Sequence, residues 1–194
     1  MGNGNYMEMT VLLVRRCLRR MELRSEPCPL RTEAFSVDER KEERKTKEEL
    51  KRIDTEVSSL LTKIRNQEKQ HEELGIHSIV RQMGRELTDV ETCILWTLFW
   101  ASFIDHIYTE GRMILLACSN GNIDELVQNR LLLQSDSALR SIGVVTVASG
   151  RHRTRVNLLE QNFALSESII RTLSHNEQAN IATFECMRLD HGTD

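Results

Sequence analysis

Two groups of arginines are the residues whose type and spacing could perform a chemical task, which is to bind phosphate. The first group is Arg15, Arg16, Arg19 and Arg20. At about 3.6 residues per turn, these lie on one side of a helix predicted over residues 5–24, opposite an apolar stripe that includes Val11 and Val14. Such a helix can lie in a membrane interface, with its guanidinium groups near anionic lipid headgroups. The alternative is a surface helix that packs on its own protein and leaves the arginines in solvent.

The second group is Arg151, Arg153 and Arg155, which lie just before another predicted helix. Guanidinium groups this closely spaced can contact the phosphates of RNA or lipid without reading a base sequence. A solvated loop is the competing interpretation, because no aromatic residue that could stack on a base lies nearby.

No residue pattern indicates catalysis or a bound metal ion. The sequence contains no phosphate-binding loop, no dinucleotide-binding fingerprint and no nucleophile elbow. Asp105 and His106 are adjacent, so on a helix their side chains point about 100° apart and cannot orient each other. Cys186 and His191 could both reach a zinc ion, but a structural zinc site needs further ligands at close spacing. We therefore expect a protein that is not an enzyme and has no metal, cofactor or small-molecule substrate.

Composition favours an intracellular globular protein. The chain has 194 residues and a net charge of −3, so it is not a polycation, and its 2 prolines disfavour a turn-rich all-β fold. The 5 cysteines are odd in number and widely spaced, which favours a reducing compartment. The longest apolar stretch, residues 93–104, is too short to cross a bilayer, which takes about 20 apolar residues. We expect a protein that is neither secreted nor membrane-spanning.

A long helix is predicted from a capping box at Ser36 to Leu74, with Gly75 as its stop. Residues 25–36, which hold both prolines, are predicted to be the linker that precedes it. From the middle of this helix, apolar residues recur at alternating spacings of three and four: Leu50, Ile53, Val57, Leu60 and Ile64. The stripe either packs on the protein's own core or forms a seam through which copies self-associate as a coiled coil.

A second capping box, Thr88 with Glu91, predicts the start of a helix that contains both tryptophans and ends at Gly111. Apolar residues surround this helix on nearly all sides, so we expect it to be the central helix of the fold. Further helices are predicted over residues 122–133, 154–173 and 176–189, whereas residues 142–147 are either a short strand or a buried helix.

The predicted fold is therefore all-α: a multi-helix bundle with one long amphipathic helix and a C-terminal helical subdomain. Residues 1–36 comprise the basic amphipathic helix and its linker. Residues 37–149 form the helical domain with the long helix and the tryptophan helix, and residues 150–194 form the C-terminal subdomain.

Three patches in the second half of the chain point to a known family. They are Ala101-Ser102 with Ile107-Tyr108, Gly143-Val144-Val145 with His152-Arg153-x-Arg155, and Glu160 to Phe163 continuing through Glu177-Gln178-Ala179. In this order, and over about residues 101–181, they resemble the matrix proteins of the orthomyxoviruses, the influenza-like family. The resemblance implies an all-helical, non-enzymatic protein that polymerises under a viral envelope and bridges lipid to ribonucleoprotein.

The chain departs from that family in its charge. It is net acidic, it lacks the family's cysteine-histidine cluster, and Lys63, Arg65 and Lys69 are separated by Gln and Glu instead of forming a compact basic run. Contacts with lipid and RNA are therefore expected from the two arginine groups.

These observations lead to two hypotheses. The first is a matrix-type structural protein that self-associates into a layer, binds anionic membrane through the first arginine group and bridges to ribonucleoprotein. It would lie at the inner face of a membrane or in a virion beneath the envelope. The alternative is a cytoplasmic coiled-coil adaptor or scaffold whose long helix binds a partner helix.

Overall fold

The computed structural model describes residues 3–25, 37–104, 107, 109–120, 123–148 and 157–175. The predicted all-α class is confirmed, since helices dominate this part of the chain and a two-stranded sheet accompanies them. The longer elements are α1 (Asn3–Ser25), α2 (Val37–Gln70), α3 (Ile76–Met83), α4 (Asp89–Ala101), α5 (Gly111–Cys118) and α8 (Glu167–His175). The shorter ones are α6 (Ile123–Asn129), the 3-10 helix η1 (Arg130–Leu133), α7 (Ala138–Ser141), β1 (Val145–Val147), the 3-10 helix η2 (Leu158–Glu160) and β2 (Phe163–Leu165).

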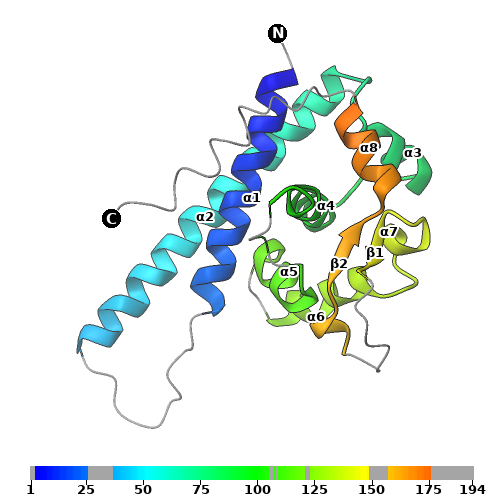
Figure 1. Ribbon diagram of the computed structural model, residues 1–194. Coiled ribbons are helices and arrows are strands. Elements are labelled where there is room, and N and C mark those ends of the chain that lie inside the picture. Colours follow the sequence, from blue (N-terminus) through cyan, green and yellow to red (C-terminus); the bar gives the residue numbers. More distant parts are fainter. Residues whose placement is uncertain are drawn as a thin grey trace.

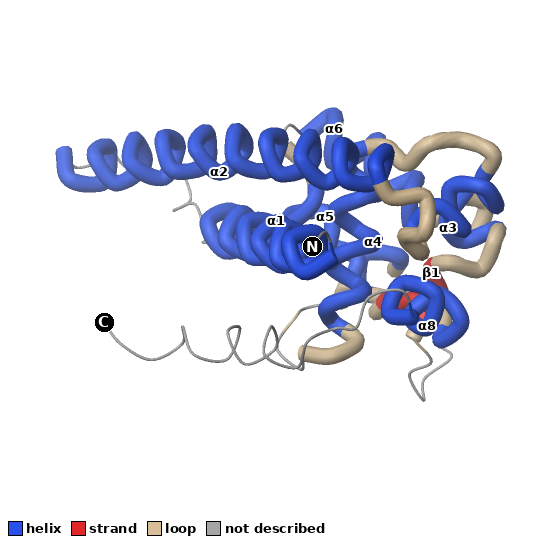
Figure 2. Tube along the Cα trace, turned by 90° about the horizontal axis from the view of Figure 1, so that it is seen from above, coloured by secondary structure: helices blue, strands red, loops and turns tan. Residues whose placement is uncertain are grey.

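Helices α1 and α2 form an antiparallel hairpin. The hydroxyl of Tyr6, near the start of α1, donates to Glu68 Oε1, near the end of α2, at 2.8 Å. Further along, Arg16 Nε lies 2.6 Å from Glu56 Oε2. Figure 1 shows the two helices side by side, and Figure 2 shows the N-terminal turns of α2 extending past α1. The long amphipathic helix expected from the sequence is present, and its apolar side is covered by α1.

Helix α4 is the centre of the fold, as predicted. Residues 91–100 are all buried, and the helix packs against α1, α5 and β2 (Figure 1). The ring of Trp96 meets that of Tyr6 edge to face at a centroid distance of 5.6 Å, and Trp100 Nε1 donates to Thr10 Oγ1 at 3.1 Å. The aromatic side chains of α4 therefore join it to α1. No helix within the described ranges is long and apolar enough to cross a bilayer.

The predicted capping box at Thr88 is confirmed, and it does more than begin helix α4. The Glu91 backbone N–H donates to Thr88 Oγ1 at 3.3 Å, and the Thr88 N–H donates to Glu91 Oε2 at 2.9 Å. The guanidinium of Arg85 adds bonds of 2.8 and 2.6 Å to the same carboxylate. Burial raises the pKa of Glu91, but the hydrogen bonds from Arg85 and Thr88 outweigh it and hold that pKa below its ordinary value. The first turn of the central helix thus contains a buried, ionised carboxylate.

Two glycines that were predicted to stop helices have a different role. Helix α2 ends at Gln70, not Leu74, and Gly75 adopts ordinary right-handed helical angles before α3. A Cβ at Gly75 would collide with the Thr172 carbonyl of α8. Helix α4 ends at Ala101, and Gly111 instead begins α5, where a Cβ would lie 2.7 Å from the Leu158 carbonyl oxygen. Both glycines are required because backbone from the C-terminal part of the chain approaches closely.

The predicted helix over residues 154–173 is wrong for residues 157–166. These form η2 and then β2, which pairs antiparallel with β1 in the register Val145↔Leu165, Thr146↔Ala164 and Val147↔Phe163. Residues 142–147 therefore contain a strand rather than a buried helix. The expected helix over 122–133 is present as α6 followed by η1, and the helix predicted over 176–189 lies outside the described residues.

A single hydrophobic core joins the three segments into which the sequence was divided. It includes Tyr6 of α1, Ile64 of α2, Trp100 of α4 and Phe163 of β2, and it reaches Leu173 of α8. The N-terminal helix and the described C-terminal residues are therefore parts of one packed body, not appendages to a central domain.

Gly75→Ala should destabilise the protein by about 1–3 kcal/mol, because the added methyl group forces α8 away from α3. The midpoint of urea unfolding checks this. The backbone of Gly75 already has ordinary helical angles, so alanine adds no backbone strain there. The only expected cost is the steric clash of the added methyl group with the Thr172 carbonyl. Unchanged or increased stability, the usual result for a Gly→Ala change in a helical conformation with free space, would contradict the assignment.

Glu91→Gln should lower the free energy of unfolding at neutral pH by about 1–3 kcal/mol, the range for hydrogen bonds to a charged group. The pKa of Glu91 is lower in the folded than in the unfolded chain, so its contribution is present above the unfolded value and is lost as the pH falls through the folded one. The stability difference between wild type and variant should therefore shrink below about pH 4. Urea titrations across this range measure it, and a difference that is independent of pH would contradict the ionised state of Glu91.

Candidate anion-binding face of the helical hairpin

The predicted solvated arginine face of α1 is wrong at Arg20. This residue is 0% exposed and lies where α1, α2 and α5 meet. Its Nη1 donates to the carbonyls of Ala117 at 3.4 Å and Ser119 at 3.2 Å, and its Nη2 lies 2.7 Å from Asp54 Oδ1. The carbonyls at the end of α5 lack partners within that helix and carry the negative end of its dipole, so they favour a cation there. Arg20 is therefore a structural contact and not a lipid ligand.

Arg24 extends the same contact by one turn. Its Nη1 donates to the Leu116 carbonyl at 2.9 Å and to the Ser119 carbonyl, and its side chain is only 10% exposed. Burial and the neighbouring charge of Arg20 lower the pKa of Arg24, while Asp54 opposes that shift. The last turn of α1 is thus fixed to α5 by two guanidinium groups.

Three thiols that were not singled out by the sequence analysis meet beside these arginines. Cys17 of α1, Cys93 of α4 and Cys118 of α5 are all buried. Hydrogen bonds from Cys118 and Cys93, and then the charges of Arg20 and Arg24, hold the pKa of Cys17 well below its usual value, whereas those of Cys93 and Cys118 are raised. No group of side chains in the described ranges is arranged to hold a metal ion. The cysteines are far apart in the sequence, so their meeting could not be foreseen from spacing.

The other arginines of the first group remain accessible but are partly neutralised by α2. Arg16 pairs with Glu56, and Arg19 Nε pairs with Glu49 at 3.0 Å; the two arginine side chains are 42% and 46% exposed. Arg15 is half-buried and also takes part in an interaction. Of the predicted arginine face, Arg16 and Arg19 therefore remain accessible to solvent, and both are paired with acids of α2.

The exposed side of α2 carries a basic face that the sequence analysis missed. Between residues 51 and 70, the exposed residues of this helix include cations but no acid. We call the following set the basic face: Lys51, Arg52, Lys63 and Lys69, with Thr55, Ser58, Ser59, Thr62, Asn66 and Gln70 between them. The acids of this stretch turn toward α1, where Asp54 meets Arg20, Glu56 meets Arg16 and Glu68 meets Tyr6. Reading the charges at helical period would have separated the two signs.

The stripe predicted for self-association is internal in this fold. Ile53, Val57 and Ile64 are buried in the core that α1 and α2 share, while Leu50 and Leu60 pack against it half-buried. The structure therefore corresponds to the intramolecular alternative. These five residues do not form a seam that a second copy could reach while α1 stays in place.

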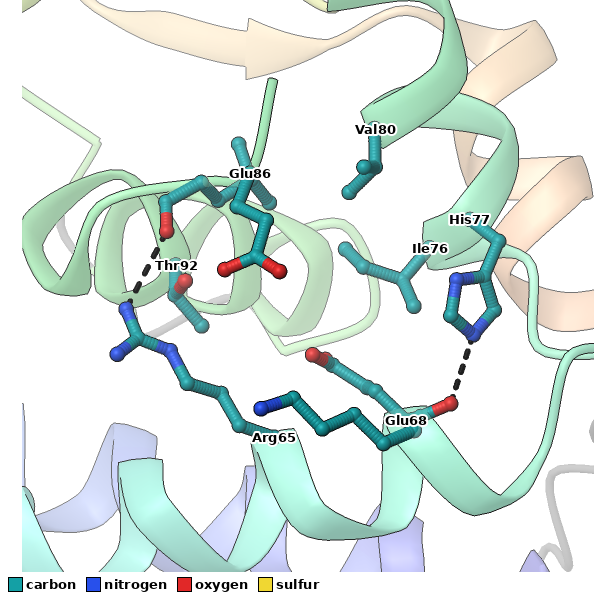
Figure 3. A pocket seen from close by; sticks show the side chains of 9 residues that line it. Arg65, Glu68, Ile76, His77, Val80, Glu86 and Thr92 are labelled. Atoms are coloured by element: carbon teal, nitrogen blue, oxygen red, sulfur yellow. Dashed lines mark hydrogen bonds between the residues drawn. The ribbon is translucent and has the colours of Figure 1, made fainter. Parts of the chain in front are cut away.

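A small pocket lies near the C-terminal end of α2, between this helix and α3 (Figure 3). It measures about 80 Å³, and its charged lining residues are Arg65, Glu68, Lys69 and Glu86. The His77 ring donates through Nε2 to the carbonyls of Glu68 at 2.8 Å and His71 at 3.1 Å, which satisfies the end of α2. Burial raises the pKa of Glu68, although the bond from Tyr6 opposes this. Arg65, Glu68 and His77 thus have partners within the protein, so we assign the pocket a structural role.

Several predicted positions lie outside the described residues. They are the second arginine group, Arg151, Arg153 and Arg155, together with Asp105, His106, Cys186 and His191. Their assignments stay predictions.

Arg20→Met should lower the free energy of unfolding by about 1–3 kcal/mol, because it removes the hydrogen bonds from a buried guanidinium to the Ala117 and Ser119 carbonyls and its ion pair with Asp54. Arg19→Met is the matched control on the same helix turn. Its ion pairs are exposed, so it should cost no more than about 1 kcal/mol. Chemical unfolding of both variants measures the difference, and equal costs would show that Arg20 is not the buried contact described.

Comparisons of this chain with protein-family models, with curated proteins and with solved structures found no match.

Proposed function

We propose that the protein is a matrix-type structural protein that attaches to anionic membrane through the basic face of the α1–α2 hairpin and self-associates there into a layer. The observation that carries the proposal is the separation of charge on α2. Its exposed side between residues 51 and 70 holds cations and no acid, although the whole chain has a net charge of −3.

The electrostatic attraction available to this face is sufficient for reversible attachment. Each cation near an anionic bilayer contributes about 1 kcal/mol, and the effect extends for about one Debye length. Lys51, Arg52, Lys63 and Lys69 together therefore supply about 4 kcal/mol. Between residues 51 and 70 the acids of α2 do not oppose this strongly, because α1 neutralises Asp54 with Arg20 and Glu56 with Arg16, whereas the exposed acids Glu42, Glu43 and Glu48 lie nearer the start of the helix.

The chemistry of the face favours a lipid surface over RNA. Hydroxyl and amide side chains lie between the cations, and no aromatic side chain is exposed on this side of α2. Proteins that bind single-stranded nucleic acid generally stack bases on aromatic rings. A straight helix of 20 residues instead presents about 30 Å of nearly level surface, which suits a sheet of headgroups. The bridge to ribonucleoprotein rests on the second arginine group and stays a prediction.

The alternative, a coiled-coil adaptor, needs a free apolar stripe on the long helix. That stripe is covered by α1, so a partner helix would first have to displace α1 and expose Ile53, Val57 and Ile64. Contacts between copies in a layer must use another surface for the same reason. Val127 and Leu131 lie four residues apart and are 64% and 57% exposed, so they are the apolar pair that fits this task.

The test compares two variants of equal net charge. In the first, Lys51, Arg52, Lys63 and Lys69 are changed to Gln. In the second, the exposed cations at the start of α2 are changed to Gln: Lys41, Arg44, Lys45 and Lys47. Sedimentation with phosphatidylcholine vesicles, with and without phosphatidylserine, should show binding of wild type and of the second variant to the anionic vesicles only. The first variant should bind about a thousandfold more weakly at low salt, since it lacks about 4 kcal/mol of attraction.

Two further observations belong to the same experiment. Binding of the wild type should weaken as salt is added, and electron microscopy of the coated vesicles should show an ordered protein layer. Equal binding by both variants, or binding that ignores salt, would exclude this face as the attachment site. A protein that stays in the supernatant with both kinds of vesicle would instead support the adaptor.

A further inference from the structure

A groove runs between α1 and α2 on the side that bears the basic face. Its volume is about 390 Å³, and it is a shallow groove open to solvent rather than an enclosed cavity. Seven residues line it: Leu12 and Arg16 from α1, and Thr55, Glu56, Ser59, Leu60 and Lys63 from α2. The groove therefore combines two leucines with cations and hydroxyl groups.

The apolar part of the groove includes a leucine that is exposed to solvent. Leu12 is 42% exposed and is the one large apolar side chain of α1 that is exposed among the described residues. Leu60, opposite it, is half-buried. An apolar ligand segment resting on both leucines would remove their accessible surface from water, which is favourable in proportion to the area covered.

The polar part offers donors that have no partner among the described residues. The hydroxyls of Thr55, Ser58 and Thr62 donate to carbonyls of their own helix at 2.9–3.0 Å. Ser59 forms no such bond, and Lys63 pairs with no acid. Because Ser59 and Lys63 are four residues apart, they lie on the same side of α2, one turn from each other.

Arg16 and Glu56 complete the groove as a fixed pair. Glu56 Oε2 holds Arg16 Nε at 2.6 Å, and Glu56 Oε1 lies 3.8 Å from Arg52 Nε. The carboxylate therefore lies between two guanidinium groups, which balance its charge. The Arg16 side chain is 42% exposed, so its guanidinium is accessible to an anion in the groove.

We propose that this groove binds one anionic phospholipid, with the phosphate at Ser59, Lys63 and Arg16 and the start of an acyl chain on Leu12 and Leu60. The inference rests on the proposed function and deepens it, because it adds a defined lipid site to a face that otherwise binds by charge alone. Inorganic phosphate would leave both leucines in water, and a neutral chain would leave the cations without a counterion. An amphiphile with one phosphate satisfies both parts of the groove.

The experiment uses dihexanoyl phosphatidic acid as a soluble, monomeric probe. Its binding to the full chain is followed by NMR, through the leucine methyl and lysine side-chain signals, and by calorimetry. Inorganic phosphate and dihexanoyl phosphatidylcholine, which has the same chains and no net charge, are the matched ligands. Phosphatidic acid should bind at least about tenfold more tightly than either one.

Two variants test the two halves of the groove. Lys63→Gln and Leu12→Ser should each weaken binding of the probe by about tenfold. Lys47→Gln and Val147→Ser, which change exposed residues elsewhere, should leave the affinity unchanged. Circular dichroism and thermal melting confirm that each variant is folded.

The outcomes separate the groove from the basic face. Phosphate that binds as tightly as phosphatidic acid, or a Leu12→Ser variant that binds normally, would overturn the lipid site. Vesicle binding without any binding of the soluble probe would overturn the groove and leave the proposed function standing. Probe binding by a protein that does not bind anionic vesicles would support the groove and overturn the proposed attachment to membrane.

Discussion

The guanidinium of Arg20 is the interaction on which the arrangement of the long helices depends. It is fully buried at the junction of α1, α2 and α5, between Asp54 and the last carbonyls of α5. A buried cation costs several kcal/mol unless an opposite charge and hydrogen-bond acceptors surround it. Here the charge comes from one helix and the acceptors from another. Helix α1 can therefore bury Arg20 only when both α2 and α5 are in place. The packing of the α1–α2 hairpin and that of α5 thus depend on each other.

The surface of α2 follows from the same constraint. Because α1 offers arginines to the inner side of the hairpin, the acids of α2 face inward at Asp54 and Glu56. The lysines and hydroxyl residues are left to face solvent, so an acidic protein presents a basic face. Leu12 of α1 and Leu60 of α2 line a groove between the two helices. Attachment by charge and the binding of a single lipid would thus use one surface whose polarity is set by interior contacts.

Close approach of backbones explains why the described C-terminal residues are part of the main body. The Thr172 carbonyl of α8 occupies the space where Gly75 would carry a side chain, and the Leu158 carbonyl does the same at Gly111. Strand β2 buries Phe163 against the central helix. These contacts put three distant segments around α4, and its aromatic residues complete the packing on the α1 side through Tyr6.

The sequence by itself determined the elements whose signals are local. The capping box at Thr88, the buried tryptophan helix and the apolar stripe of α2 each follow from periodicity or from hydrogen bonds between near neighbours. Only the tertiary structure decided which partner each surface meets. An arginine on an amphipathic helix is the same residue whether it faces water or, like Arg20, the carbonyl end of another helix. Likewise, the strand at Phe163 depends on pairing with residues 145–147, and no short segment encodes the presence of its partner. Local signals fix which residues share a face, whereas contacts between residues far apart in the chain decide what that face touches.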